Sequence, residues 1–349
     1  MENFSRNHLK LIGIRQRFFV RYWPVLLIFP VFFFFWSFSL GRYPIGYQDL
    51  VRTVYLHYSD PSKIIDLNME TVLFNIRIPR VLVVLMVGAG MSMAGSAYQG
   101  MFRNPLVSPD ILGVTAGASF GAALAIIQKQ PISRIQLFAF AGGILAVYCA
   151  TRFERMIRYD PVLALVLGGI LIKGLFNAGL SVVKYLADPE QSLPAITFWL
   201  MGTFTDVVKK NIPQVAIPLI ISMILLYINR QRLNVVSFGD EEAKTMGVRT
   251  KHVRLEVIIA CTLITASSVS ICGQVGWIGL IIPHLARSLT GPNYRVLLPV
   301  SAILGSCFLL LCDTVCRNAF AVELPIGILT SLMGIPFFII IFKQKASKA

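Results

Sequence analysis

Residues 161–186 read PVLALVLGGILIKGLFNAGLSVVKYL, and the only charged side chains among them are Lys173 and Lys184. A helix needs about 20 mainly apolar residues to cross the hydrocarbon core of a bilayer. A segment this long and this apolar is predicted to be a membrane-spanning helix. It therefore sets the class of fold against which the rest of the chain is interpreted.

The composition of the 349 residues agrees with a membrane protein. Hydrophobic residues make up 56%, charged residues make up 14%, and the mean hydropathy is +0.70. A typical soluble domain has about 25% charged residues, and disordered chains combine low hydrophobicity with high charge. The figures exclude both an ordinary soluble globular protein and a disordered one.

Further apolar stretches recur along the chain. They predict an all-α polytopic membrane protein with about ten transmembrane helices in one domain, residues 1–349. The other spans are expected at 20–40, 81–99, 107–127, 135–151, 212–229, 253–272, 275–289, 297–316 and 324–342. The apolar stretch 193–207 is too short to cross, and it predicts a half-helix with Trp199 at the depth of the lipid headgroups.

The net charge of +15 fits the tendency of Lys and Arg to collect in cytoplasmic loops. With a cytoplasmic N-terminus, the inside segments carry about twice as many basic residues as the outside segments. We therefore expect both termini in the cytoplasm and the chain in the plasma (cytoplasmic, or inner) membrane. No basic run interleaved with aromatic residues occurs, so we expect no nucleic acid partner.

The sequence lacks motifs for chemistry of its own. It contains no Gly-Lys dipeptide of a phosphate-binding P-loop and no His-Glu-x-x-His zinc helix. The six cysteines lie in or beside apolar stretches, and no His or carboxylate stands at zinc-site spacing beside them. We expect no enzyme activity, no catalytic residue, no metal site and no cofactor.

The polar loop 230–252 is the most informative part outside the spans. Acidic residues suit the start of a helix, where the helix dipole is positive, and a glycine suits its end. The pattern predicts a helix of about two turns, with Ala243 and Met246 near one face. Such a helix is either an ordinary solvated loop helix or a docking element for a partner. Its candidate residues are Gly239, Asp240, Glu241, Glu242, Ala243, Met246 and Gly247.

Several short motifs then follow one another in a recognisable order. They are Arg77-Ile-Pro-Arg80, Gln99-Gly-Met-Phe-Arg-Asn-Pro-Leu106, Thr197-Phe-Trp-Leu-Met-Gly202, the Gly-Asp-Glu-Glu-Ala loop, Gly276-Trp-Ile-Gly-Leu-Ile-Ile-Pro-His284, Arg295-Val-Leu-Leu-Pro299 and Glu323-Leu-Pro-Ile-Gly327. From about residue 70 to 343 the chain resembles the FecCD-type permease subunits of type II ABC importers, which take up ferric siderophores, haem and vitamin B12.

The resemblance implies a set of partners. Such a permease works as a homodimer in membrane lipid, with two copies of a cytoplasmic ATP-binding subunit and an extracytoplasmic substrate-binding protein. A ferric siderophore is the first expectation for the substrate, and haem, cobalamin or an oxyanion such as molybdate are alternatives. An ion-coupled secondary transporter is the alternative class of protein.

The resemblance also implies residue roles. The helix in loop 230–252 would be the ATPase-coupling helix. Arg77, Arg80 and Arg317, which by themselves suit headgroup anchors at span ends, would receive acidic side chains of the binding protein as exposed docking residues. The turn Tyr159-Asp160-Pro161 would form the inner gate, with Asp160 as N-cap and Pro161 at the helix start.

Two charges and a glycine series inside the spans leave alternatives open. Asp313 stands four residues before Arg317, which predicts a local ion pair. Lys173 departs from the family pattern, and it either faces the pathway, forms a structural pair or snorkels. The spacing of Gly113, Gly117 and Gly121 suits close helix packing, either in a dimer or, as we expect, within the subunit.

Overall fold

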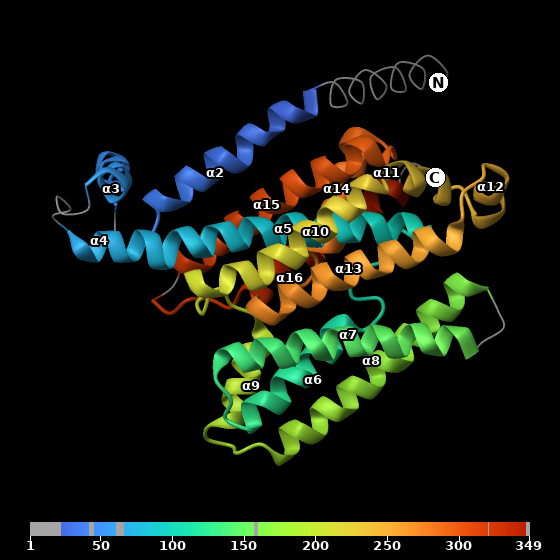
Figure 1. Cartoon of the computed structure of the whole chain (residues 1–349), viewed down its shortest axis with the longest axis horizontal. Coiled ribbons are helices and arrows are strands. Elements are labelled where there is room, and N and C mark those ends of the chain that lie inside the picture. Colours follow the sequence, from blue (N-terminus) through green and yellow to red (C-terminus); the bar gives the residue numbers. More distant parts are fainter. Residues whose placement is uncertain (1–21, 42–44, 61–65, 157–159, 320, 347–349) are drawn as a thin grey trace.

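The computed structural model describes residues 22–41, 45–60, 66–156, 160–319 and 321–346 (Figure 1). Within these ranges the chain is helical and has no β-strand. The longer helices are α2 (Ile28–Ser39), α3 (Tyr47–Ser59), α5 (Ile78–Met101), α6 (Val114–Ile127), α7 (Ile132–Met156), α8 (Pro161–Leu186), α9 (Ser192–Met201), α10 (Ile212–Ile228), α13 (Thr250–Cys272), α14 (Ile278–Thr290), α15 (Tyr294–Asn318) and α16 (Ile326–Ala346). The short helices are α4 (Leu67–Thr71), α11 (Arg230–Val236) and α12 (Asp240–Thr245).

The centre of the bundle is formed by α5, α10, α13, α14 and α15. Polar hydroxyls join α5 to α15, because Ser96 Oγ lies 2.8 Å from Ser301 Oγ and Ser306 Oγ donates to the carbonyl of Leu85 at 2.8 Å. Helices in lipid gain little from apolar burial and rely on small residues and interhelical hydrogen bonds. These contacts explain how α5 and α15 pack side by side along much of their length.

A second layer consists of α6, α7, α8 and α9, which lie together on one side of the central helices (Figure 1). Gly117 of α6 lies directly against Gly142 of α7, so closely that a Cβ on either residue would strike the other backbone. Gly121 meets the backbone of Phe138 in the same way. The expectation that this glycine series packs within the subunit is therefore confirmed for these two positions.

The predicted span 107–127 is helical only from Val114 onward. Residues 104–113 form turns, and α6 begins at Val114, after Gly113 adopts a left-handed backbone with φ of 80°. The side chain of Asp110 accepts a hydrogen bond from the amide of Thr115 at 2.7 Å. The first amides of a helix have no acceptor within the helix, and here the Asp110 carboxylate accepts from one of them. This hydrogen bond stabilises the start of α6 at Val114, and the preceding residues of the predicted span stay outside the helix.

Each predicted span contains a helix, but not every helix is long enough to cross a bilayer alone. In the described part of the chain, five helices have the length and composition of a membrane span, or six if the bent pair α10 and α11 is counted as one. The helices α6 and α14 are shorter, because α6 follows the turns at 104–113 and α14 starts only at Ile278. The short helix expected within 193–207 is α9.

The bundle has two ends, between which α5 runs. The end that carries α12 is called the α12 end, and the end that carries Arg80 and α4 is called the Arg80 end (Figure 1). The sequence did not predict α3 and α4, which precede α5 at the Arg80 end. Asp66 caps α4 by accepting from the amide of Met69 at 2.9 Å.

Candidate functional site

The loop between α11 and α13 forms α12, as the sequence predicted. Asp240, Glu241 and Glu242 lie in its first turn, where negative charge interacts favourably with the helix dipole. Gly247 follows with a left-handed backbone, φ 78°, and the amide of Val248 donates to the carbonyl of Ala243. Both predicted boundaries of this helix are confirmed.

The prediction that Ala243 and Met246 share one face of α12 is wrong. Ala243 is fully buried, whereas Met246 is exposed. The carboxylate of Asp240 lies 2.7 Å from the guanidinium of Arg254 on α13, which holds the buried side of α12 against the bundle. Large exposed side chains on and beside this helix are Phe238, Glu241, Lys244 and Met246.

The start of α8 lies at the same end. Asp160 caps the helix by accepting from the amides of Val162 at 2.8 Å and Leu163 at 3.0 Å, and Pro161 occupies the first turn. The hydrogen bond from Leu163 is the main cause that lowers the pKa of Asp160, with help from Val162 and the positive charge of Arg103. The predicted cap and helix start are confirmed, while Tyr159 lies outside the described residues.

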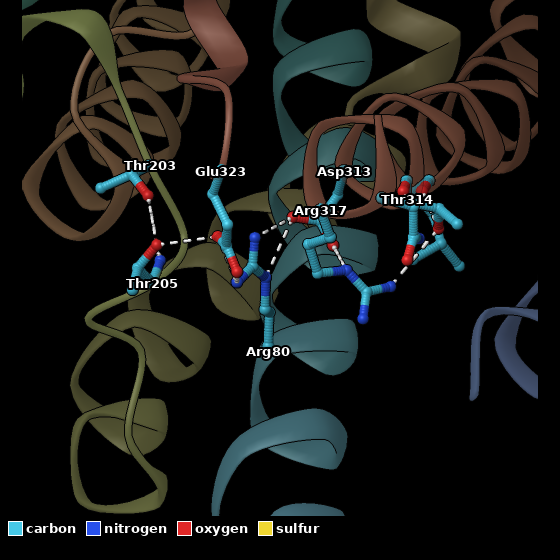
Figure 2. A network of polar contacts seen from close by, with 9 residues as sticks. Arg80, Thr203, Thr205, Asp313, Thr314, Arg317 and Glu323 are labelled. Carbon is cyan, nitrogen blue, oxygen red and sulfur yellow. Dashed lines mark hydrogen bonds and ion pairs between the residues drawn. The ribbon is translucent and has the colours of Figure 1, made fainter. Parts of the chain in front are cut away.

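A buried ion-pair network occupies the Arg80 end (Figure 2). Arg80 of α5 donates to Asp313 Oδ1 from Nε at 3.0 Å and from Nη2 at 2.8 Å. Its Nη1 reaches Glu323 Oε2 at 2.9 Å, and Arg317 Nε lies 3.1 Å from Asp313 Oδ2. The predicted pair between Asp313 and Arg317 is therefore confirmed, and Arg80 extends it to a network that joins α5, α15 and the segment before α16.

Two loop threonines complete this network. Thr205 donates from Oγ1 to Glu323 Oε2 at 3.0 Å, and Thr203 Oγ1 lies 2.7 Å from Thr205 Oγ1. Partial burial acts to raise the pKa of Glu323, but the charge and hydrogen bonds of Arg80 outweigh it and hold the pKa below its ordinary value. The network therefore fixes the loop after α9 and the segment before α16 to the start of α5.

The expected exposure of the three arginines is wrong. Arg77, Arg80 and Arg317 are only 5%, 6% and 7% exposed. Arg77 donates to the backbone carbonyl of Phe38, and the other two arginines face Asp313. Arg80 faces inward because its partner Asp313 lies 233 residues away in the sequence, and Arg77 because its partner Phe38 lies 39 residues away. Arg317 turns toward Asp313 on its own helix, four residues before it.

A cavity of about 930 Å³ opens beside the network. Glu323 and Thr205 form part of its wall, and Asp206 lies on the same wall. Most of the remaining lining is apolar and comes from the ends of α6, α7, α9 and α16, including Ile126, Ile135, Phe198 and Trp199. The cavity therefore offers a largely apolar surface with acidic groups at the Arg80 end.

Lys173 forms a structural ion pair. Its Nζ lies 2.7 Å from Asp110 Oδ2, and Asp110 belongs to the turns that precede α6. The side chain of Lys173 is still 49% exposed, and that of Asp110 is 21% exposed. Of the alternatives left open for Lys173, the structure shows pairing, and about half of the side chain stays exposed.

Sequence reasoning missed the partners of its own candidate residues. Glu323 belongs to a recognised motif and Asp110 follows one closely, but neither was assigned a role. The basic residues inside or beside the predicted spans could have indicated these partners, because a lysine or arginine inside a span requires an acidic partner. Among the described residues, no group of three or more His, Cys, Asp or Glu could hold a metal ion.

The fold and both ends define a polytopic membrane protein whose polar groups bind the helices together. Residues 27–344 match the model of the FecCD transport family. The chain belongs to this family and is the permease of an ABC importer, embedded in the membrane, with ATPase activity in a partner subunit. Family membership replaces the alternative of an ion-coupled secondary transporter.

Individual relatives cover most of the chain. The molybdate import system permease protein MolB of Haemophilus influenzae is 38% identical over 312 residues, which cover 88% of this chain and 91% of that protein. A probable iron chelatin transport system permease protein of Helicobacter pylori is 35% identical over 289 residues, 83% of this chain and 86% of that protein. A solved metal-chelate type ABC transporter in an inward-facing conformation is 35% identical, with a TM-score of 0.81, and the match covers 91% of this chain and 97% of that chain.

Proposed function

We propose that this chain forms, as a homodimer, the translocation pathway for a metal chelate, with a ferric siderophore as the first candidate. The observation that carries this proposal is the fit to the metal-chelate type transporter over 91% of the chain. The iron chelatin relative supports the same substrate class. The chain supplies the pathway, and ATP hydrolysis in the partner supplies the driving force.

Molybdate is the second candidate. The relative named for molybdate import is 38% identical over 88% of the chain. Molybdate and many ferric chelates carry negative charge, so the half-exposed ammonium of Lys173 suits either of them. The two candidates differ in metal, and uptake measurements separate them directly.

The α12 end is proposed to face the cytoplasm, together with both termini. There the α12 helix of each permease subunit would dock one of the two ATP-binding subunits through Glu241 and Met246, which are exposed. The turn at Tyr159, Asp160 and Pro161 would form the inner gate of the dimer. This orientation follows the distribution of basic residues between the two sides.

The Arg80 end is proposed to face the substrate-binding protein on the outside. Because Arg77, Arg80 and Arg317 are buried, their contribution to docking would be indirect. The network of Arg80, Asp313 and Glu323 fixes the loops beside the cavity, and the binding protein would contact those loops. Docking would then depend on loop position more than on direct contact with the arginines.

Reconstitution tests the proposed function. The permease is placed in proteoliposomes with its ATP-binding subunit and its substrate-binding protein, and uptake of radiolabelled ferric siderophore and molybdate is measured. ATP-dependent uptake of the ferric chelate is expected, and the ligand that co-purifies with the binding protein should contain iron by metal analysis. Uptake of molybdate alone would replace the first candidate with the second, and uptake without ATP would overturn the proposal.

A further inference from the structure

The exposed surface of α8 has two chemically different sides. Lys173, Asn177 and Ser181 are four residues apart and therefore share one side of the helix. Exposed aliphatic residues occupy an adjacent arc, including Leu171, Leu175 and Val182. The polar side begins at Lys173 in the middle of α8, and it continues toward Lys184 near the end of the helix.

A polar stripe of this kind does not suit contact with lipid. A neutral amide such as that of Asn177 costs free energy in hydrocarbon when it lacks a partner, and a charged group such as the Lys173 ammonium costs more. The Ser181 hydroxyl contributes less to this argument, because it donates to the carbonyl of Asn177 at 3.0 Å. The aliphatic arc suits lipid or a second subunit, whereas the stripe suits water. Toward Pro161 the side that bears the stripe becomes aliphatic at Val166 and Ile170, so the polar part of this surface ends at Lys173.

The ammonium of Lys173 retains hydrogen-bonding capacity. It donates to Asp110 Oδ2 at 2.7 Å, and an ammonium has three donors. The Asp110 carboxylate is held more firmly, because its Oδ1 also accepts from the amide of Thr115 at 2.7 Å. The next residue along the helix, Gly174, faces open space, since a Cβ added there would meet no atom within 4 Å.

We propose that the Lys173 ammonium is a binding site for the negative charge of the cargo, at the inner limit of a water-filled pathway along α8. The ligand class is an oxyanion or a carboxylate-bearing metal chelate. Asp110 is the resident counter-ion that offsets the lysine when no anion is bound. This inference rests on the proposed function for its cargo, and it selects anionic over neutral substrates.

The electrostatic part can be tested without any cargo. Asn177→Cys is introduced with Cys149→Ser, because Cys149 is the partly exposed native cysteine and the other five are buried. The protein in proteoliposomes is treated with a small anionic or a small cationic thiosulfonate of the same size. The ratio of the two reaction rates reports the electrostatic potential at position 177, one helical turn from Lys173.

The expected ratios follow from the charges. Lys173→Met removes a positive charge about 6 Å away and leaves Asp110, so the preference for the anionic reagent should fall by about fivefold at low ionic strength. Asp110→Asn should raise the preference by a smaller factor. The double variant Lys173→Met/Asp110→Asn is neutral at this site, and its ratio should lie between that of Lys173→Met and the original ratio. If Lys173→Met does not fold, the increase with Asp110→Asn decides the question.

Two results would overturn the inference. One is a ratio that none of these substitutions changes. The other is a Leu175→Cys variant that reacts as fast as Asn177→Cys, because the aliphatic arc would then be as wet as the stripe. Normal ratios together with failed ATP-dependent uptake would instead reject the proposed function and leave the anion site standing.

Protection of the thiol tests the ligand class. Molybdate and ferric citrate should slow the labelling of Asn177→Cys, and a neutral ferric trihydroxamate at the same concentration should not. Lys173→Met should abolish protection by both anions. Equal protection by the neutral chelate, or no protection by either anion, would contradict anion binding at Lys173.

Discussion

Asp313→Asn is the substitution that the Arg80 network predicts to be most damaging. The side chain of Asp313 is 1% exposed, and its carboxylate accepts hydrogen bonds from Arg80 Nε at 3.0 Å and Nη2 at 2.8 Å. Arg317 Nε lies 3.1 Å from the same carboxylate. Two guanidinium groups are balanced by Asp313 and Glu323. Asparagine keeps the shape and one acceptor, but it leaves one positive charge in excess in a buried place.

The magnitude follows from the cost of breaking a buried ion pair. Removing one partner costs about 3–5 kcal/mol, because the other charge stays buried without compensation. The asparagine oxygen can still accept one hydrogen bond, so we expect the lower limit, about 3 kcal/mol. The loss should appear as a lower midpoint of thermal unfolding in detergent and as a lower yield of folded protein.

Two variants control this measurement. Asp313→Asn/Arg317→Gln restores the charge balance and should recover part of the lost stability. Asp206→Asn removes an exposed carboxylate at the same end and should leave the midpoint unchanged. The reasoning would be refuted if Asp313→Asn unfolded at the same temperature as the unaltered protein, or if adding Arg317→Gln lowered the midpoint further.

Three other predictions concern both ends of the bundle. The double variant Glu241→Ala/Met246→Ala should fold normally, but less ATP-binding subunit should co-purify with it and ATP-driven uptake should be lost. Normal co-purification together with normal uptake would exclude α12 as the coupling element. Asp160→Ala should lower stability by about 1 kcal/mol through loss of the N-cap, whereas Asp160→Asn should not, and equal unfolding midpoints for the two would contradict the capping role. The pKa of Glu323 is lowered in the folded protein, so its contribution to stability is present above the unfolded pKa of about 4.3 and is lost as pH falls through the folded pKa. Glu323→Gln should therefore weaken the dependence of the unfolding midpoint on pH in the acid range. An unchanged dependence would show that protonation of this carboxylate is not coupled to folding.

The helices could be predicted from the sequence because their signals are local. The apolar length of 161–186 specifies α8, Asp160 and Pro161 specify its start, and the acidic turn and Gly247 specify the limits of α12. Each of these features acts within a few residues, through backbone hydrogen bonds and chain conformation. The pair of Asp313 and Arg317 was predictable for the same reason, since one helical turn separates them.

The partners of Arg80 and Lys173 could not be predicted in this way. Arg80 meets Asp313 across 233 residues, and Lys173 meets Asp110 across 63. The orientation of α12 likewise depends on a distant residue, Arg254, which explains why Ala243 faces inward. The local sequence indicates that a buried positive charge needs an acidic partner. Only the packing of the helices decides which acidic residue becomes that partner.

The two ion-pair sites differ in a way that matters for transport. At Asp313 and Arg80 the partners are almost fully buried and several hydrogen bonds hold each group, so exchange with a passing anion would cost much of the fold's stability. At Lys173 the ammonium has one bond to Asp110 and is half exposed. A water-exposed pair gains little net free energy from its attraction, so an incoming anion can compete with Asp110 at small cost. A cation–carboxylate pair therefore stabilises the bundle where it is buried, at the Arg80 end, and can bind cargo where it is exposed, in the middle of α8.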